Sequence, residues 1–106
     1  MGTKIEVTQA DNELYVIASA VPAGPSTELI HIMTGNNLPV SATVAAGGPL
    51  QSGTYNLFFI GINWGGPSNY AVSVSTAGGV TPYTGGGTSA TGVTAFPTSS
   101  GIQITV

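Results

Sequence analysis

A single imidazole is available for acid–base chemistry in this chain, because His31 is its only histidine. A hydrolytic triad needs a nucleophile, a base and an orienting acid within hydrogen-bond reach of one another. Serines are plentiful, but the nearest acid, Glu28, is three residues from His31 and is expected on the opposite face of a strand. We therefore expect His31 to be a structural or surface residue, and we predict that the chain has no catalytic residues and is not an enzyme.

The four carboxylates predict solvated surface positions rather than a paired acid–base site. Glu6 and Glu13 could face each other across a first hairpin, but both have the pattern of solvent positions. Asp11, Asn12 and Glu13 offer two carboxylates within three residues, whereas calcium takes six or more oxygen ligands. One histidine and no cysteine disfavour a transition-metal site as well. We predict no bound metal and no cofactor.

The most suggestive binding motif runs from residue 63 to residue 70. It places the rings of Trp64 and Tyr70 and the amides of Asn63 and Asn69 around a loop that contains Pro67. Aromatic faces can stack on the C–H groups of a sugar while amides bond its hydroxyls, and a neutral ligand suits an almost uncharged surface. The alternative is that Trp64 caps the core and the asparagines hold the turn. The hypothesis of a small lectin-like module assigns contact with a neutral glycan to Asn63, Trp64, Ser68, Asn69 and Tyr70.

Charge is the unusual property of the composition, since 5% of the 106 residues are charged against about a quarter in a typical domain. One lysine and no arginine cannot neutralise a row of phosphates or attract anionic headgroups, so neither nucleic acid nor a membrane surface is an expected partner. The chain has no cysteine, no apolar run of about 18 residues and no visible signal peptide. We expect a soluble protein without membrane insertion, cytoplasmic by default, with non-classical export left open.

The elements that must position these residues are predicted to be strands. The 16 glycines and 7 prolines are spread along the chain and favour short strands joined by turns. Asp11 and Asn12 supply the turn of a first hairpin. We predict one domain over residues 1–106, an all-β antiparallel β-sandwich of the immunoglobulin-like type with about seven short strands. The expected strands are 4–8, 13–20, 27–33, 40–44, 54–63, 70–76 and 101–106.

Residues 77–101 are low in complexity and contain a quasi-repeat, with Gly-Val-Thr-Pro-Tyr at 79–83 and Gly-Val-Thr-Ala-Phe at 92–96. A wholly unstructured loop of this length is unusual in a compact domain. We therefore expect a short strand near 93–96 and a second near 80–83. Chance similarity within a biased composition is the alternative.

A local motif supports the sandwich. Ser52-Gly53-Thr54-Tyr55, leading into the strongest predicted strand, resembles the tyrosine corner of immunoglobulin-like sandwiches. In that motif a turn containing glycine precedes a tyrosine whose hydroxyl bonds to nearby backbone. Gln51 and Ser52 stand where those domains usually place an acidic residue. The resemblance implies architecture and transfers no function.

Two predicted strands are apolar on both sides, at 29–33 and 57–60. A strand in a two-layer sandwich has one inner face and should alternate. If Tyr55, Leu57 and Phe59 fill the core, their neighbours in sequence point outward. The residues predicted to form an outward apolar surface are Leu29, His31, Met33, Phe58, Ile60 and Ile62.

Such a surface needs a cover, because large exposed apolar patches are rare on monomers. Either the segment 77–101 folds over it or another copy of the chain does. The edge strands carry almost no charge to deter pairing, which favours a second copy. We therefore predict a non-catalytic interaction or structural module that associates with itself or with another protein.

Overall fold

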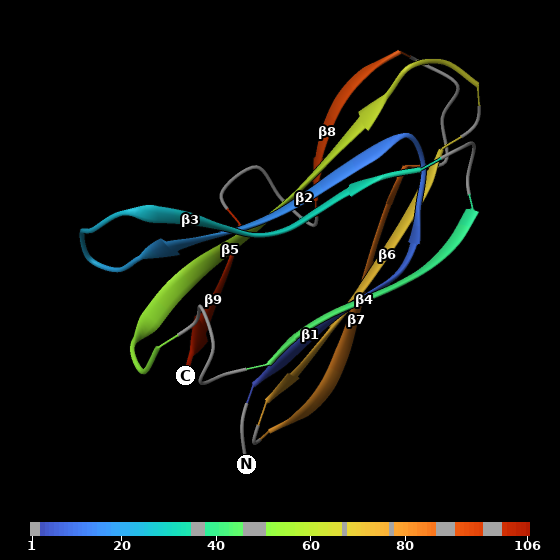
Figure 1. Ribbon diagram of the computed structural model, residues 1–106. Coiled ribbons are helices and arrows are strands. Elements are labelled where there is room, and N and C mark those ends of the chain that lie inside the picture. Colours follow the sequence, from blue (N-terminus) through green and yellow to red (C-terminus); the bar gives the residue numbers. More distant parts are fainter. Residues whose placement is uncertain are drawn as a thin grey trace.

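The protein is an all-β sandwich of two antiparallel sheets, as the sequence predicts (Figure 1). The computed structural model describes residues 3–34, 38–45, 51–66, 68–76, 78–86, 91–96 and 101–106, with the backbone alone at 38–45 and 86. These residues form β1 (Lys4–Ala10), β2 (Glu13–Ala20), β3 (Ser26–Met33), β4 (Leu38–Ala45), β5 (Thr54–Asn63), β6 (Asn69–Thr76), β7 (Gly79–Gly86), β8 (Gly92–Phe96) and β9 (Ile102–Thr105).

The described strands number nine rather than about seven, because both halves of the quasi-repeat form strands of their own. β7 contains the first half and pairs with β6, and β8 contains the second half and pairs with β5. The expectation of strands near 80–83 and 93–96 is confirmed. No helix that could span a bilayer occurs in the described part of the chain.

The turn at Asp11 and Asn12 joins the two sheets, and the predicted first hairpin is wrong. β1 pairs with β4 and β6 in the sheet β4-β1-β6-β7, whereas β2 pairs with β3 and β5 in the other sheet. The two strands meet at one end of the sandwich and diverge into opposite layers (Figure 1). Asn12 has a φ of 49°, a left-handed conformation that serves a corner as well as a hairpin. Glu6 and Glu13 therefore lie on different sheets.

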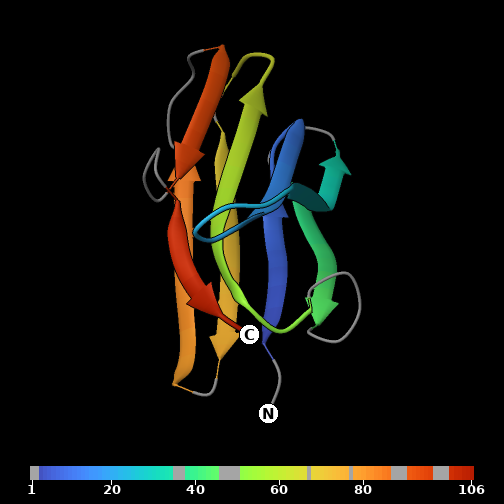
Figure 2. The same cartoon turned by 90° about the vertical axis from the view of Figure 1, so that its left-hand side faces the viewer.

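β5 is the central strand of the five-stranded sheet. One of its sides pairs with β2 along eight residues, and the other pairs first with β9 and then with β8. Figure 2 shows β8 and β9 one after the other along that side of β5. β5 thus pairs with three of the other four strands of this sheet, and β3 is joined to it through β2.

The core is formed by alternate residues of both sheets. Along β2, Leu14, Val16 and Ala18 are buried, and along β6 the buried set is Tyr70, Val72 and Val74. In both strands these residues alternate with more exposed ones, which is the period of a strand with one face in the core. Aromatic rings from opposite sheets meet in this core, and the centroids of Tyr70 and Phe96 are 5.8 Å apart.

Each of these two rings lies against a glycine of the facing sheet. A Cβ atom at Gly61 would be 2.4 Å from the Tyr70 ring, and one at Gly85 would be 2.6 Å from the Phe96 ring. Gly61 belongs to β5 and Gly85 to β7, so the two contacts are reciprocal across the core. The absence of side chains at these positions lets the sheets pack closely around the rings.

The predicted tyrosine corner is present where the chain enters β5. The Tyr55 hydroxyl donates a hydrogen bond to the Gln51 carbonyl oxygen at 2.8 Å. Gly53, in the turn, has a φ of 155° and exchanges backbone hydrogen bonds with Val106. The corner fixes the start of the central strand, while the immunoglobulin-like assignment of the whole sandwich stays a prediction.

Candidate functional site

The outer side of the five-stranded sheet is apolar at its centre. In β5, Leu57 and Phe59 are buried, whereas Phe58, Ile60 and Ile62 are partly exposed on the other side of the strand, as predicted. β2 has the same alternation in register with β5. Tyr15 lies opposite Ile60, and Ile17 lies opposite Phe58. The two central strands therefore present a continuous row of apolar side chains away from the core.

A β-bulge in β3 changes which of its residues join this surface. Val16 pairs with Ile30 and Ile17 with Glu28, so Leu29 is the extra residue. Leu29 packs against the core beside Ile30, and the prediction that it points outward with His31 is wrong. The bulge instead brings Glu28 onto the outer side. The prediction that Glu28 and His31 lie on opposite faces is therefore also wrong.

β8 extends the surface on the far side of β5. Val93 is paired with Ile62 and Ala95 with Ile60, and both are exposed. Val93 is 70% exposed and Met33, at the opposite edge on β3, is 63% exposed. Val93 was not among the residues predicted for this surface, because no partner strand was predicted for residues 93–96. We call this surface the apolar face, and it consists of Tyr15, Ile17, Met33, Phe58, Ile60, Ile62, Val93 and Ala95.

Polar residues border the apolar face where β5 begins. Asn56 is paired with Ser19 and Gln103, and Thr54 with Thr105. The hydroxyl of Ser26 donates to that of Ser19 at 3.0 Å. An apolar centre with a polar rim is the usual composition of a protein interaction surface.

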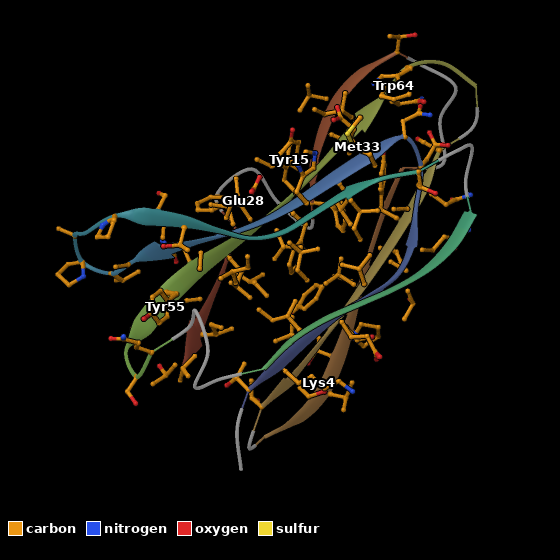
Figure 3. All side chains as sticks on the ribbon, viewed as in Figure 1. Lys4, Tyr15, Glu28, Met33, Tyr55 and Trp64 are labelled. Carbon is orange, nitrogen blue, oxygen red and sulfur yellow. The ribbon has the colours of Figure 1, made fainter. Side chains whose placement is uncertain are left out.

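Trp64 follows β5 at the other end of the apolar face. Asn63 is buried, and Trp64, the next residue, is 57% exposed. Its backbone N–H donates to Asn12 Oδ1 at 2.8 Å, while the Asn12 carbonyl accepts from the Thr34 N–H at 2.8 Å. Asn12 thus ties together the ends of β3 and β5. Figure 3 shows Trp64 at the same end of the molecule as Met33.

The structure separates the residues predicted to bind a glycan. Tyr70 is in the core, and Ser68 and Asn63 are buried. The Asn63 amide donates to the Gly66 carbonyl at 2.9 Å and accepts from the Gly65 N–H at 3.0 Å, so it holds the turn. Trp64 and Asn69 remain exposed. The alternative in which the asparagines hold the turn thus applies to Asn63, and the indole is too exposed to be a core cap.

The outer side of the four-stranded sheet differs in character. Lys4 and Glu6 form an ion pair of 3.8 Å there, and the facing positions of β6 are Ser73 and Ser75. Figure 3 shows Lys4 on this sheet, away from Tyr15, Glu28 and Met33. Among side chains that the structure describes, Val80 is the one large hydrophobic residue strongly exposed on this sheet. Over the described part of the chain, the extended apolar surface therefore lies on one side of the sandwich.

A cluster of titratable groups lies within the β2–β3 half of the apolar face. His31 Nε2 is 3.3 Å from Glu13 Oε1, and its Nδ1 is 3.9 Å from Glu28 Oε1. The imidazole stacks on the Tyr15 ring with centroids 4.1 Å apart and an interplanar angle of 14°. Partial burial, followed by the charges of Glu13 and Glu28, raises the pKa of the Tyr15 hydroxyl. The described residues contain no group of three side chains arranged to hold a metal ion.

The described part of the segment 77–101 does not cover the apolar face. β7 belongs to the opposite sheet, and β8 lies at the edge of the face and enlarges it. Gly101, where the segment ends, is the exception, because its backbone packs against the Phe58 ring. Residues 87–90 and 97–100 lie outside the described part.

No protein-family model matches the chain, and no match was found among curated proteins or solved structures.

Proposed function

We propose that this chain is a non-catalytic β-sandwich module that self-associates through the apolar face. The observation that carries the proposal is the contrast between the two outer surfaces. One carries apolar side chains from four strands, and the other carries the chain's only lysine, Lys4, with Glu6 and the β6 serines Ser73 and Ser75. Burial of apolar surface is the main driving force for protein association, at about 25 cal/mol per Å².

The size of the apolar face fits a transient dimer. Its eight side chains each occupy about 6.8 Å along a strand and about 4.8 Å between strands, and together they cover about 260 Å² in projection. A standard interface buries about 800 Å² of accessible surface on each partner. The apolar face is smaller than that, so we expect dissociation in the micromolar range or above.

A second copy suits the distribution of charge on the apolar face. Glu13, Glu28 and His31 are all on the β2–β3 half, and the β5–β8 half is apolar. A two-fold axis parallel to the strands would lay the charged half of each copy on the apolar half of the other. Like charges then stay apart, and two stacked sheets can pack at the usual spacing of about 10 Å. We favour self-association over glycan binding because three of the five residues of the glycan hypothesis are buried.

Two valines provide a matched test. Val93 on the apolar face and Val80 on the opposite sheet are both in edge strands, and they are 70% and 67% exposed. Sedimentation velocity over a range of concentrations should show the wild-type mass rising above 10.5 kDa. Val93→Glu should weaken dimerisation at least about tenfold, because it buries an unpaired carboxylate in the interface. Val80→Glu should behave as wild type.

The proposal fails if the wild-type chain remains a monomer at high micromolar concentration. It also fails if Val93→Glu and Val80→Glu change the association equally, because the effect would then come from net charge. Far-UV circular dichroism of both variants serves as the control for folding. Both positions are exposed, so neither substitution should unfold the sandwich.

A further inference from the structure

We infer that self-association through the apolar face takes up protons, with His31 as the group that binds them. This inference rests on the proposed function, because it concerns the same surface. It predicts that the dimer is tighter at about pH 6 than at about pH 8.

The geometry of the cluster is the basis of the inference. Both nitrogens of the imidazole have a carboxylate within 4 Å, with Glu13 on the neighbouring strand and Glu28 brought onto the same side by the β-bulge. One face of the ring is covered by Tyr15. Protonation at either nitrogen therefore places a positive charge beside a negative one.

Covering this cluster with a second copy changes the balance between its protonation states. With a neutral imidazole, each copy carries the two negative charges of Glu13 and Glu28 into an interface that excludes water. With a protonated imidazole, the same surface carries a net charge of −1 and has an ion pair at its centre. Charge is expensive to desolvate and attraction grows as water leaves, so the protonated form is favoured in the dimer.

No other titratable group faces His31 in the described structure. β2 contributes Glu13 and Tyr15 and β3 contributes Glu28, while the outer positions of β5 are Asn56, Phe58, Ile60 and Ile62. Lys4, Glu6 and their ion pair are on the opposite sheet. His31 is also the only histidine in the sequence, so one substitution removes the imidazole from the system.

The direction of the pH dependence follows from linkage. A state that binds more protons gains stability as the pH falls, and each proton taken up raises the association constant about tenfold per pH unit. The dimer contains two copies of His31, which sets an upper limit of about 100-fold per unit. We expect the dissociation constant to fall at least about fivefold between about pH 8 and about pH 6.

The test measures dimerisation of the wild-type chain, His31→Gln and Glu13→Gln by sedimentation velocity at both pH values. Glutamine keeps a planar polar side chain at position 31 but does not change its charge. His31→Gln should abolish the dependence on pH, and Glu13→Gln should reduce it because one carboxylate is gone. Val93→Glu, measured alongside, reports whether the apolar face is the interface.

The outcomes separate the inference from the function on which it rests. Wild-type association that Val93→Glu weakens, but that is equally tight at both pH values, overturns the proton linkage alone. The same holds if His31→Gln retains the full dependence on pH. A chain that does not associate at either pH, or associates regardless of Val93→Glu, overturns the proposed function and the linkage with it.

Discussion

Adding one methyl group at Gly61 should destabilise the sandwich, and this substitution tests the packing that holds the apolar face in place. A Cβ at Gly61 would be 2.4–2.8 Å from three atoms of the Tyr70 ring. Tyr70 is 1% exposed and stacks on Phe96, so the ring has no free space into which to move. The backbone of Gly61 lies outside the left-handed region, so alanine is excluded by its contacts and not by its φ.

The size of the effect follows from the overlap. The ring would have to move about 1 Å to reach an ordinary carbon contact, and overpacking of a core costs about 1–3 kcal/mol. We take the upper end of this range of overpacking costs, because Gly61 lies in β5 and Tyr70 in β6, and each of these strands is paired on both sides. A glycine-to-alanine change recovers about 0.7 kcal/mol by restricting the unfolded chain. The net loss is about 2 kcal/mol, which lowers Tm by about 9 °C for a chain of this length.

The assay is urea unfolding followed by far-UV circular dichroism, with the free energy of unfolding extrapolated to water. Gly78→Ala is the matched control, because a Cβ there meets one atom, Thr76 Oγ1, at an ordinary 3.7 Å. Tyr70→Leu removes the ring, so Gly61→Ala should cost less in that background than in the wild type. The reasoning is refuted if Gly61→Ala is as stable as Gly78→Ala, or if the Tyr70→Leu background leaves its cost unchanged.

Two further predictions concern tyrosine hydroxyls. Tyr55→Phe removes the hydrogen bond to the Gln51 carbonyl and should lower the free energy of unfolding by about 0.5–1 kcal/mol. An unchanged midpoint of urea unfolding would show that this hydrogen bond does not stabilise the tyrosine corner. Burial, with a smaller contribution from the charge of Asp11, raises the pKa of Tyr70 to about 12. The unfolded chain therefore releases this proton first, so stability should decline from about pH 10 towards pH 12, and Tyr70→Phe should flatten that decline. Equal slopes for the two proteins would show that Tyr70 is not the group responsible.

Alternation along a single strand was sufficient to predict the two faces of β5. The inward residues Leu57 and Phe59 and the outward residues Phe58, Ile60 and Ile62 follow from a period of two residues. This period is a local property, because successive side chains of any strand point to opposite faces. The tyrosine corner is also local, since its hydrogen bond spans four residues.

Which strands pair with one another could not be predicted from local alternation in the same way. The turn at Asp11 and Asn12 is compatible with a hairpin, and its role as a corner depends on β1 and β2 finding separate partners far along the chain. The bulge at Leu29 likewise exists only in the register of β3 against β2. It exchanges Leu29 for Glu28 on the outer side, and so creates the cluster around His31.

The sequence by itself determined that this protein is built from strands, that it carries almost no charge, and that two of its strands are apolar on both sides. Only the tertiary structure decided that these side chains gather on one sheet, that Tyr70 is in the core while Trp64 is exposed, and that His31 lies between two carboxylates. The physical reason is that the direction of a side chain is set by its own backbone, whereas its neighbours are set by residues distant in the chain.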